Sequence, residues 1–129
     1  MRRNISCYIM ASFYFFAGLN HFIRPDGYIK MIPDYFKFHT LINYLSGFAE
    51  ILLGIMVAIS VSRRFACKAI ILMLVLFLPV HIYMLQTGWC LNGKCFPFWL
   101  IWVRLLILQP LLIYWAWWNM QRQKKSTLT

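Results

Sequence analysis

The chain has 129 residues, enough for one domain, and 62% of them are hydrophobic while only 12% are charged. A domain of this size buries too little of its surface to hide so much apolar side chain from water, which excludes a water-soluble globular protein. The net charge of +10 would fit a nucleic-acid partner, but the basic residues lie just outside long apolar runs, where they indicate membrane topology instead. We therefore expect an integral membrane protein with no nucleic-acid partner.

Four apolar runs have about the 20 residues that a helix needs to cross a bilayer. They cover residues 4–22, 41–62, 65–87 and 99–119. No run alternates in polarity as a membrane-spanning strand does. The prediction is an all-α, integral membrane four-helix bundle that forms a single transmembrane domain over residues 1–129. The first run is too long for the core of a signal peptide, and Ala17-Gly18-Leu19 is a poor cleavage site, so we expect a retained helix.

The distribution of Lys and Arg predicts the orientation of this bundle. One face carries seven of these residues and the other carries four: Arg2, Arg3, Arg63, Arg64, Arg122, Lys124 and Lys125 against Arg24, Lys30, Lys37 and Lys94. This places both termini in the cytoplasm and predicts a multi-pass membrane protein. Residues 23–40 form an outer loop rich in aromatic residues, which we interpret as an interfacial belt rather than a lid, and residues 120–129 form a short basic tail.

Four ionisable side chains lie inside the predicted spans, one on each: His21, Glu50, His81 and Arg104. An uncompensated charge near the bilayer centre costs about 2.5–3.5 kcal/mol on insertion scales, so such residues normally face the bundle interior and pair. All four fall in the outer half of the membrane, and we expect Glu50 to pair with Arg104. The other candidate members of this polar core are Asn20, Tyr83 and Gln109.

The second span indicates which way Glu50 points. Asn43, Gly47, Glu50 and Gly54 follow at spacings of four, three and four residues, which places them on one helical face. Small residues on that face let a neighbouring helix approach closely. Whether the polar core is a binding site or a structural clasp stays open. For His81 a packing role is favoured over metal binding, and no ligand spacing indicates a metal site.

Two cysteines, Cys90 and Cys95, bracket a short loop between the third and fourth spans. On the predicted outer side of the membrane, thiols at this spacing are expected to form a disulfide. A structural staple is the favoured interpretation. The alternative is a redox pair that exchanges electrons with a quinone beside His81 and Arg104.

The ordered motifs resemble those of the DoxX-like family of small four-helix membrane proteins. They are Ala17-Gly18-Leu19-Asn20-His21-Phe22 with Pro25, Met31-Ile32-Pro33, Ser46-Gly47-Phe48-Ala49-Glu50 with Gly54, Phe77-Leu78-Pro79-Val80-His81-Ile82-Tyr83-Met84, and Arg104 with Gln109 and Trp115-Ala116. The resemblance implies a protein of the bacterial inner (plasma) membrane. It also implies a small subunit of a quinone-dependent redox complex, of an oxidative-stress complex or of a receptor assembly. The fourth span departs from the family pattern, because the proline follows Gln109 at Pro110.

Two functional hypotheses are compatible with these features. In the first, the chain is a quinone-linked redox accessory subunit, not a stand-alone enzyme, that binds a lipophilic ligand in an outward-facing polar core. Arg104 and His81 would bond a quinone carbonyl, and Glu50 would hold Arg104. Its partners would be membrane lipid, another membrane or redox subunit, or a second copy. In the second, it is a non-enzymatic assembly or scaffold protein whose Glu50–Arg104 pair is a clasp. A transporter is disfavoured because the chain shows no inverted repeat.

Overall fold

A computed structural model describes residues 2–91 and 94–128, and it confirms the predicted all-α class. The helices are α1 (Arg2–Ile23), α2 (Pro25–Ile29), α3 (His39–Ala58), α4 (Arg63–Leu76), α5 (Leu78–Thr87), α6 (Phe98–Val103), the π-helix η1 (Arg104–Leu108) and α7 (Gln109–Leu128). Two short strands, β1 (Trp89–Leu91) and β2 (Lys94–Phe96), form an antiparallel hairpin between α5 and α6.

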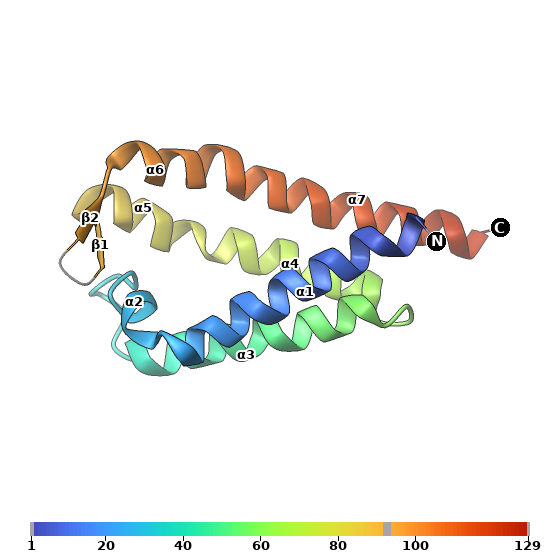
Figure 1. Cartoon of the computed structure of the whole chain (residues 1–129), viewed down its shortest axis with the longest axis horizontal. Coiled ribbons are helices and arrows are strands. Elements are labelled where there is room, and N and C mark those ends of the chain that lie inside the picture. Colours follow the sequence, from blue (N-terminus) through green and yellow to red (C-terminus); the bar gives the residue numbers. More distant parts are fainter. Residues whose placement is uncertain (1, 92–93, 129) are drawn as a thin grey trace.

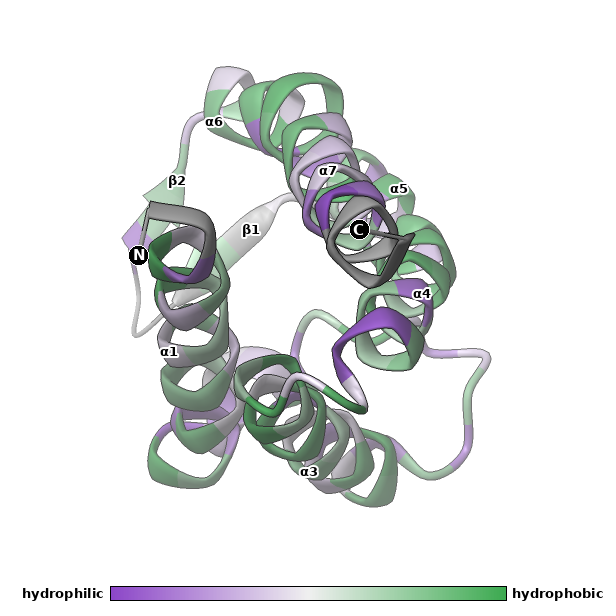
Figure 2. Cartoon of the chain, turned by 90° about the vertical axis from the view of Figure 1, so that its right-hand side faces the viewer, coloured by the Kyte–Doolittle hydropathy of each residue, from purple (hydrophilic) through white to green (hydrophobic). Residues whose placement is uncertain are grey.

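The long helices run lengthwise through the molecule, with both termini at one end and the hairpin and α2 at the other (Figure 1). Seen end-on, α1 lies beside α3, α3 beside α4, and α4 beside α7 (Figure 2). The core between them is apolar and includes fully buried residues from all four helices: Met10, Val57, Ile70 and Ala116. The bundle is thus held by apolar packing along its length, with α1 closest to α3.

Within the described residues, three helices are long and apolar enough to cross a membrane: α3, the α4–α5 pair over Arg63–Thr87, and α6–η1–α7 over Phe98–Arg122. These correspond to the second, third and fourth predicted spans. The first predicted span also forms a helix, α1, but α1 is not among the three. The polar residues Asn4, Asn20 and His21 lower its mean hydropathy. The structure therefore supports three spans directly.

Glycines bring α1 and α3 into backbone contact. A Cβ atom added to Gly18 would lie 2.5 Å from the carbonyl oxygen of Gly47, and one added to Gly47 would lie 2.6 Å from the Cβ atom of His21. At Gly54 it would lie 2.8 Å from the carbonyl oxygen of Ala11. Small residues at such a crossing allow the close approach that the spacing of Gly47 and Gly54 predicts.

Prolines interrupt the third and fourth apolar segments in two different ways. Pro79 lies at the start of α5, directly after the break between α4 and α5 at Phe77. Pro110 lies at the start of α7, and here the chain stays helical by widening to η1, whose closing bond runs from the Gln109 N–H to the Arg104 carbonyl. A proline cannot donate to the carbonyl four residues before it, and a π-turn is one way to absorb that missing bond.

The connection between α3 and α4 differs from the prediction. The predicted spans leave Arg63 and Arg64 as a short basic linker after residue 62, but α3 ends at Ala58 and Arg63 begins α4. Arg63 is buried, and its guanidinium donates to the carbonyl oxygens of Val57 at 2.7 Å and Ala58 at 3.1 Å. These carbonyls have no helical partners at the end of α3, so an arginine that follows the turn can cap them.

The opposite end of the bundle is closed by the loop between α1 and α3. Its residues Ile32 and Pro33 are buried, and His39 donates from Nε2 to the Pro33 carbonyl at 3.1 Å. This segment is therefore packed onto the bundle and includes the short helix α2, which the sequence did not indicate.

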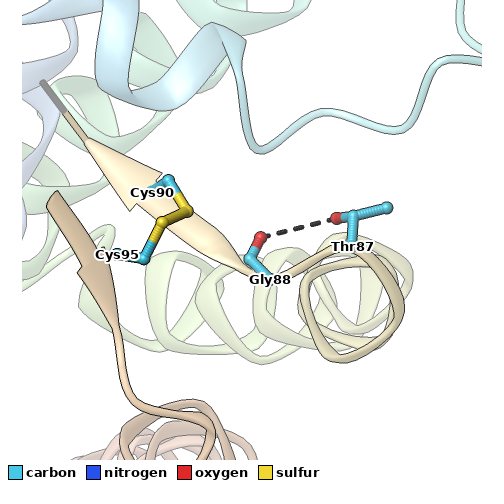
Figure 3. Close-up of a disulfide and its surroundings, with 4 residues drawn as sticks. All are labelled: Thr87, Gly88, Cys90 and Cys95. Atoms are coloured by element: carbon cyan, nitrogen blue, oxygen red, sulfur yellow. Dashed lines mark hydrogen bonds between the residues drawn. A yellow bond between two sulfur atoms is a disulfide. The ribbon is translucent and has the colours of Figure 1, made fainter. Parts of the chain in front are cut away.

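The hairpin carries a disulfide between Cys90 and Cys95, which face each other in the β1–β2 register (Figure 3). Gly88 ends α5 with φ of +84°, a conformation that side chains disfavour, and this redirects the chain from α5 into β1. The Thr87 hydroxyl donates to the carbonyls of Tyr83 and Gly88 at the same turn. The disulfide lies at the exposed tip of the molecule and braces the turn between α5 and α6.

The close contact of Gly47 with α1 predicts that one added methyl group will lower stability. We expect Gly47→Ala to lower stability by about 1–3 kcal/mol, because overpacking must push α1 away from α3. Thermal unfolding of the purified protein in detergent measures this as a lower Tm. Leu45→Ala, on the exposed face of the same helix, is the control, and an unchanged Tm for Gly47→Ala would contradict the close approach.

Arg63 caps α3 and the neighbouring Arg64 does not, so the two residues should contribute differently to stability. We expect Arg63→Met to cost about 1–3 kcal/mol, because it leaves buried carbonyls without donors. Arg64→Met, at an exposed position, should change stability by less than about 0.5 kcal/mol. Equal losses of Tm for the two variants would refute the capping role.

Candidate functional site

The site begins at the end of α1, where a proline leaves a carbonyl without its helical partner. Pro25 stands four residues after His21 and has no N–H to donate to the His21 carbonyl. The Asn43 amide from α3 takes that place, donating from Nδ2 to the His21 oxygen at 3.1 Å. The Asn43 Oδ1 atom lies 2.8 Å from Nδ1 of the His21 ring. One amide thus fixes both the end of α1 and the orientation of its histidine.

Glu50 lies about two turns after Asn43 on the same face of α3. Its Oε2 atom is 3.4 Å from Nε2 of His21, and both side chains are only 9% exposed. Within the described part of the chain, this oxygen is buried and has no hydrogen-bond partner. A carboxylate so placed is costly unless something compensates for its lost water.

A tyrosine from α2 covers the other side of His21. The Tyr28 ring stacks on the imidazole with the ring centroids 3.8 Å apart and the planes 20° apart. Its hydroxyl accepts a hydrogen bond of 2.7 Å from Nδ2 of Asn20. Asn20, His21 and Tyr28 therefore form one packed unit at the α1–α2 junction.

A second polar pair joins α5 to η1. Arg104 donates from Nε to Nε2 of His81 at 2.8 Å, and Nδ1 of His81 donates to the Phe77 carbonyl at 2.8 Å. Arg104 is the first residue of the π-helix. Both ring nitrogens of His81 are thus engaged, which gives this histidine a fixed orientation.

The two pairs approach each other across the bundle. Glu50 and Tyr28 both lie within electrostatic range of the Arg104 guanidinium. We use the term polar cluster for the set of seven residues that α1, α2, α3, α5 and η1 contribute: Asn20, His21, Tyr28, Asn43, Glu50, His81 and Arg104.

The pairing inside the polar cluster differs from the predicted one. The sequence led us to expect a Glu50–Arg104 ion pair, whereas the structure places Glu50 against His21 and bonds Arg104 to His81. Helical spacing gives the depth of a side chain but not the rotation of one helix against another, so it could not select the partner. Tyr28 was assigned to the interfacial belt, and its role in the cluster was missed.

Two predicted members lie outside the cluster. Tyr83 donates its hydroxyl to Oδ2 of Asp34 at 2.8 Å in an exposed contact with the outer loop. Gln109 is buried and donates from Nε2 to the Leu74 carbonyl at 2.6 Å, close to the break between α4 and α5. Gln109 thus ties α7 to α4 instead of completing the site.

A separate hydrogen-bonded group lies at the end that holds both termini. The Ser6 hydroxyl donates to Oδ1 of Asn119 at 3.0 Å and accepts from the Trp115 indole at 2.8 Å. The Asn119 amide reaches the sulfur of Met10 at 3.7 Å. Trp115 thus links α7 to α1.

A shallow, open and mostly apolar groove lies on the exposed face of α1 and ends at Asn20 of the polar cluster. It has a volume of about 490 Å³ and is lined by Ile9, Ser12, Phe13, Phe16, Ala17 and Asn20. Asn20 is therefore shared between the groove and the Tyr28–His21 unit. Among the described residues no group of three or more His, Cys, Asp or Glu side chains could hold a metal ion.

The family comparison corrects the resemblance drawn from the motifs. The family model that matches is described as "Domain of unknown function (DUF8561)" and covers residues 10–120, well over half of the chain. The DoxX-like assignment is therefore wrong. Its motifs consist mostly of helix, turn and small residues, which the packing of many helical bundles requires. No curated protein and no solved structure matches the chain. The chain belongs to the DUF8561 family of unknown function.

Proposed function

We propose that the chain is a four-helix integral membrane protein, with α1 as its fourth span. Two of the polar residues that lower the hydropathy of α1 turn toward protein partners: Asn20 bonds Tyr28, and His21 bonds Asn43. Polar side chains in a spanning helix are tolerated when they face the bundle and pair. The charge distribution supports an orientation with both termini in the cytoplasm. The polar cluster then lies toward the outer surface.

In this setting we propose that the polar cluster binds the head group of a lipophilic ligand. The observation that carries this proposal is the groove on α1, because its apolar wall ends at an amide. Phe13 and Phe16 are exposed along the groove, and Asn20 closes it at the end near α2. An amide nitrogen has two hydrogens, and Asn20 uses one of them for Tyr28. The second matches an acceptor on a ligand that enters sideways from the lipid.

A quinone fits this arrangement as ligand. Its carbonyl oxygens accept hydrogen bonds, its ring can pack against phenylalanine, and its prenyl tail suits an apolar groove. The geometry changes the expected donors: His81 already uses both ring nitrogens for Arg104 and Phe77, so Asn20 takes the role that the sequence gave to His81. The chain would then act as an accessory subunit, and a separate redox subunit would exchange electrons with the bound quinone.

The second candidate function is a scaffold for another membrane subunit. It is favoured by a wholly apolar depression of about 340 Å³ on α7, lined by Leu111, Leu112, Tyr114, Trp115 and Trp118. A partner helix could pack there, and the polar cluster would serve only to hold the bundle together. Binding of a quinone to the purified protein separates the two candidates.

We expect a short-chain benzoquinone to bind the purified protein in lipid nanodiscs and to quench its tryptophan fluorescence in a saturable manner. Asn20→Leu should weaken this binding at least tenfold, because it removes the donor at the end of the groove, a loss of about 1.4 kcal/mol. Tyr28→Phe is the matched control, because it removes the same Asn20–Tyr28 bond but leaves the amide in the groove. Absence of saturable binding to the wild-type protein would refute the ligand site and favour the scaffold.

The proposed orientation predicts that a reporter protein will be active at only one of two positions, the C-terminus or the β1–β2 hairpin. Alkaline phosphatase should be inactive when fused after residue 129 and active when inserted in the hairpin, because it folds only outside the cytoplasm. A fluorescent protein should show the reverse pattern. The opposite result for either reporter would mean that the bundle is inverted and that the polar cluster lies on the inner side.

A further inference from the structure

The hydrogen bonds around Asn43 determine which way its amide points. Nδ2 must face the His21 carbonyl, because a reversed amide would set two acceptor oxygens against each other at this 3.1 Å contact. Oδ1 therefore faces Nδ1 of the His21 ring. Oδ1 can only accept, so Nδ1 of His21 must carry a hydrogen. Because Pro25 has no N–H for the His21 carbonyl, the Asn43 amide donates to it instead. The resulting amide orientation determines that Nδ1 of His21 carries the hydrogen.

This tautomer creates a conflict at the other ring nitrogen. A neutral imidazole with a hydrogen on Nδ1 has a bare lone pair on Nε2. That nitrogen lies 3.4 Å from Oε2 of Glu50, which in an ionised carboxylate is also an acceptor. Oε2 is buried and accepts no hydrogen bond from the residues that the structure describes. A neutral His21 beside an ionised Glu50 would leave two buried acceptors facing each other, which is unfavourable.

One additional proton removes the conflict. Placed on Nε2 it gives an imidazolium beside a carboxylate, and placed on Oε2 it gives a carboxylic acid that donates to a neutral imidazole. In either form a shift of a few tenths of an ångström converts the contact into a normal hydrogen bond. We propose that His21 and Glu50 together bind one proton and form a proton-binding site in the interior of the bundle. Hydrogen-bond geometry alone supports this site, which does not depend on the proposed ligand.

The groups around the pair determine how the site responds when the proton leaves. Tyr28 from α2 stacks on His21, and Tyr14 from α1 lies within electrostatic range of Glu50. From α4, Cys67 lies near Tyr14. From η1, the Arg104 guanidinium also lies within electrostatic range of Glu50. Release of the proton to the outer aqueous phase would leave one negative charge, which Arg104 would have to balance.

The second histidine provides an internal comparison. His81 donates from Nδ1 to a carbonyl and accepts from Arg104 at Nε2, so its neutral form satisfies both nitrogens. No further proton is needed there, and a proton on Nε2 would displace the Arg104 donor. The same residue type thus serves two different purposes in one cluster.

NMR of nitrogen-labelled histidine in the full-length protein in nanodiscs tests the proposal at near-neutral pH. For His21 we expect either the imidazolium pattern, or a neutral ring together with the infrared C=O band of a protonated Glu50. His81 should be neutral with its hydrogen on Nδ1. A neutral His21 with an ionised Glu50 in the wild-type protein would overturn the proposal, and this measurement requires no variant.

Two variants sharpen the assignment. Glu50→Gln supplies an N–H that can donate to Nε2, so we expect it to fold, to lose the protonated-carboxyl band if the wild type shows one, and to show a neutral His21 at the same near-neutral pH. Asn43→Asp keeps an acceptor toward Nδ1 but cannot donate to the His21 carbonyl, and should lower the Tm. Arg64→Met is the control and should leave both spectra unchanged. A persistent imidazolium signal from His21 in Glu50→Gln would show that the proton does not belong to the pair.

Discussion

The absence of one N–H group at Pro25 organises much of this molecule. It leaves the His21 carbonyl without a helical partner in an apolar setting, where an unpaired carbonyl costs several kcal/mol. The Asn43 amide satisfies that carbonyl and, with its other end, orients the His21 ring toward Glu50. Asn43 can reach only because Gly18 and Gly47 let α1 and α3 touch. The close crossing, the helix end and the polar pair are therefore parts of a single arrangement.

Other interrupted helices in the chain follow the same rule. Arg63 caps the end of α3, and Gln109 donates to the Leu74 carbonyl beside the break at Pro79. In each case a long polar side chain supplies the donor that the backbone lacks. These residues are buried because they complete hydrogen bonding, so burial of a polar group in this bundle does not by itself indicate a binding site. His21 and Glu50 stand apart, because their contact lacks a proton in the neutral-ring, ionised-carboxylate state.

The sequence predicted the parts of the structure that depend on local periodicity. Helix starts lie within about two residues of the expected starts, and the small-residue face of the second span does contact α1. The pairing of Glu50 with His21 could not be predicted, because the rotation of each helix depends on the packing of its neighbours. Pro25 was the available signal: a proline four residues after a polar helical residue marks a carbonyl that needs a donor. The family was misassigned because the motifs used for it consist mostly of small and turn residues. Such residues recur in unrelated helical bundles, because close helix packing requires them.

The contact between His21 and Glu50 is both a structural link between α1 and α3 and a candidate functional site. Asn43 and Glu50 hold α1 against α3, yet Glu50 retains an oxygen that the described protein groups leave unsatisfied. A purely structural pair would place donor against acceptor, as Arg104 and His81 do. The His21–Glu50 contact instead couples the fit between two helices to the presence of one proton. Because the same helix α1 carries the groove and Asn20, the charge of this pair would also be felt by anything bound in the groove.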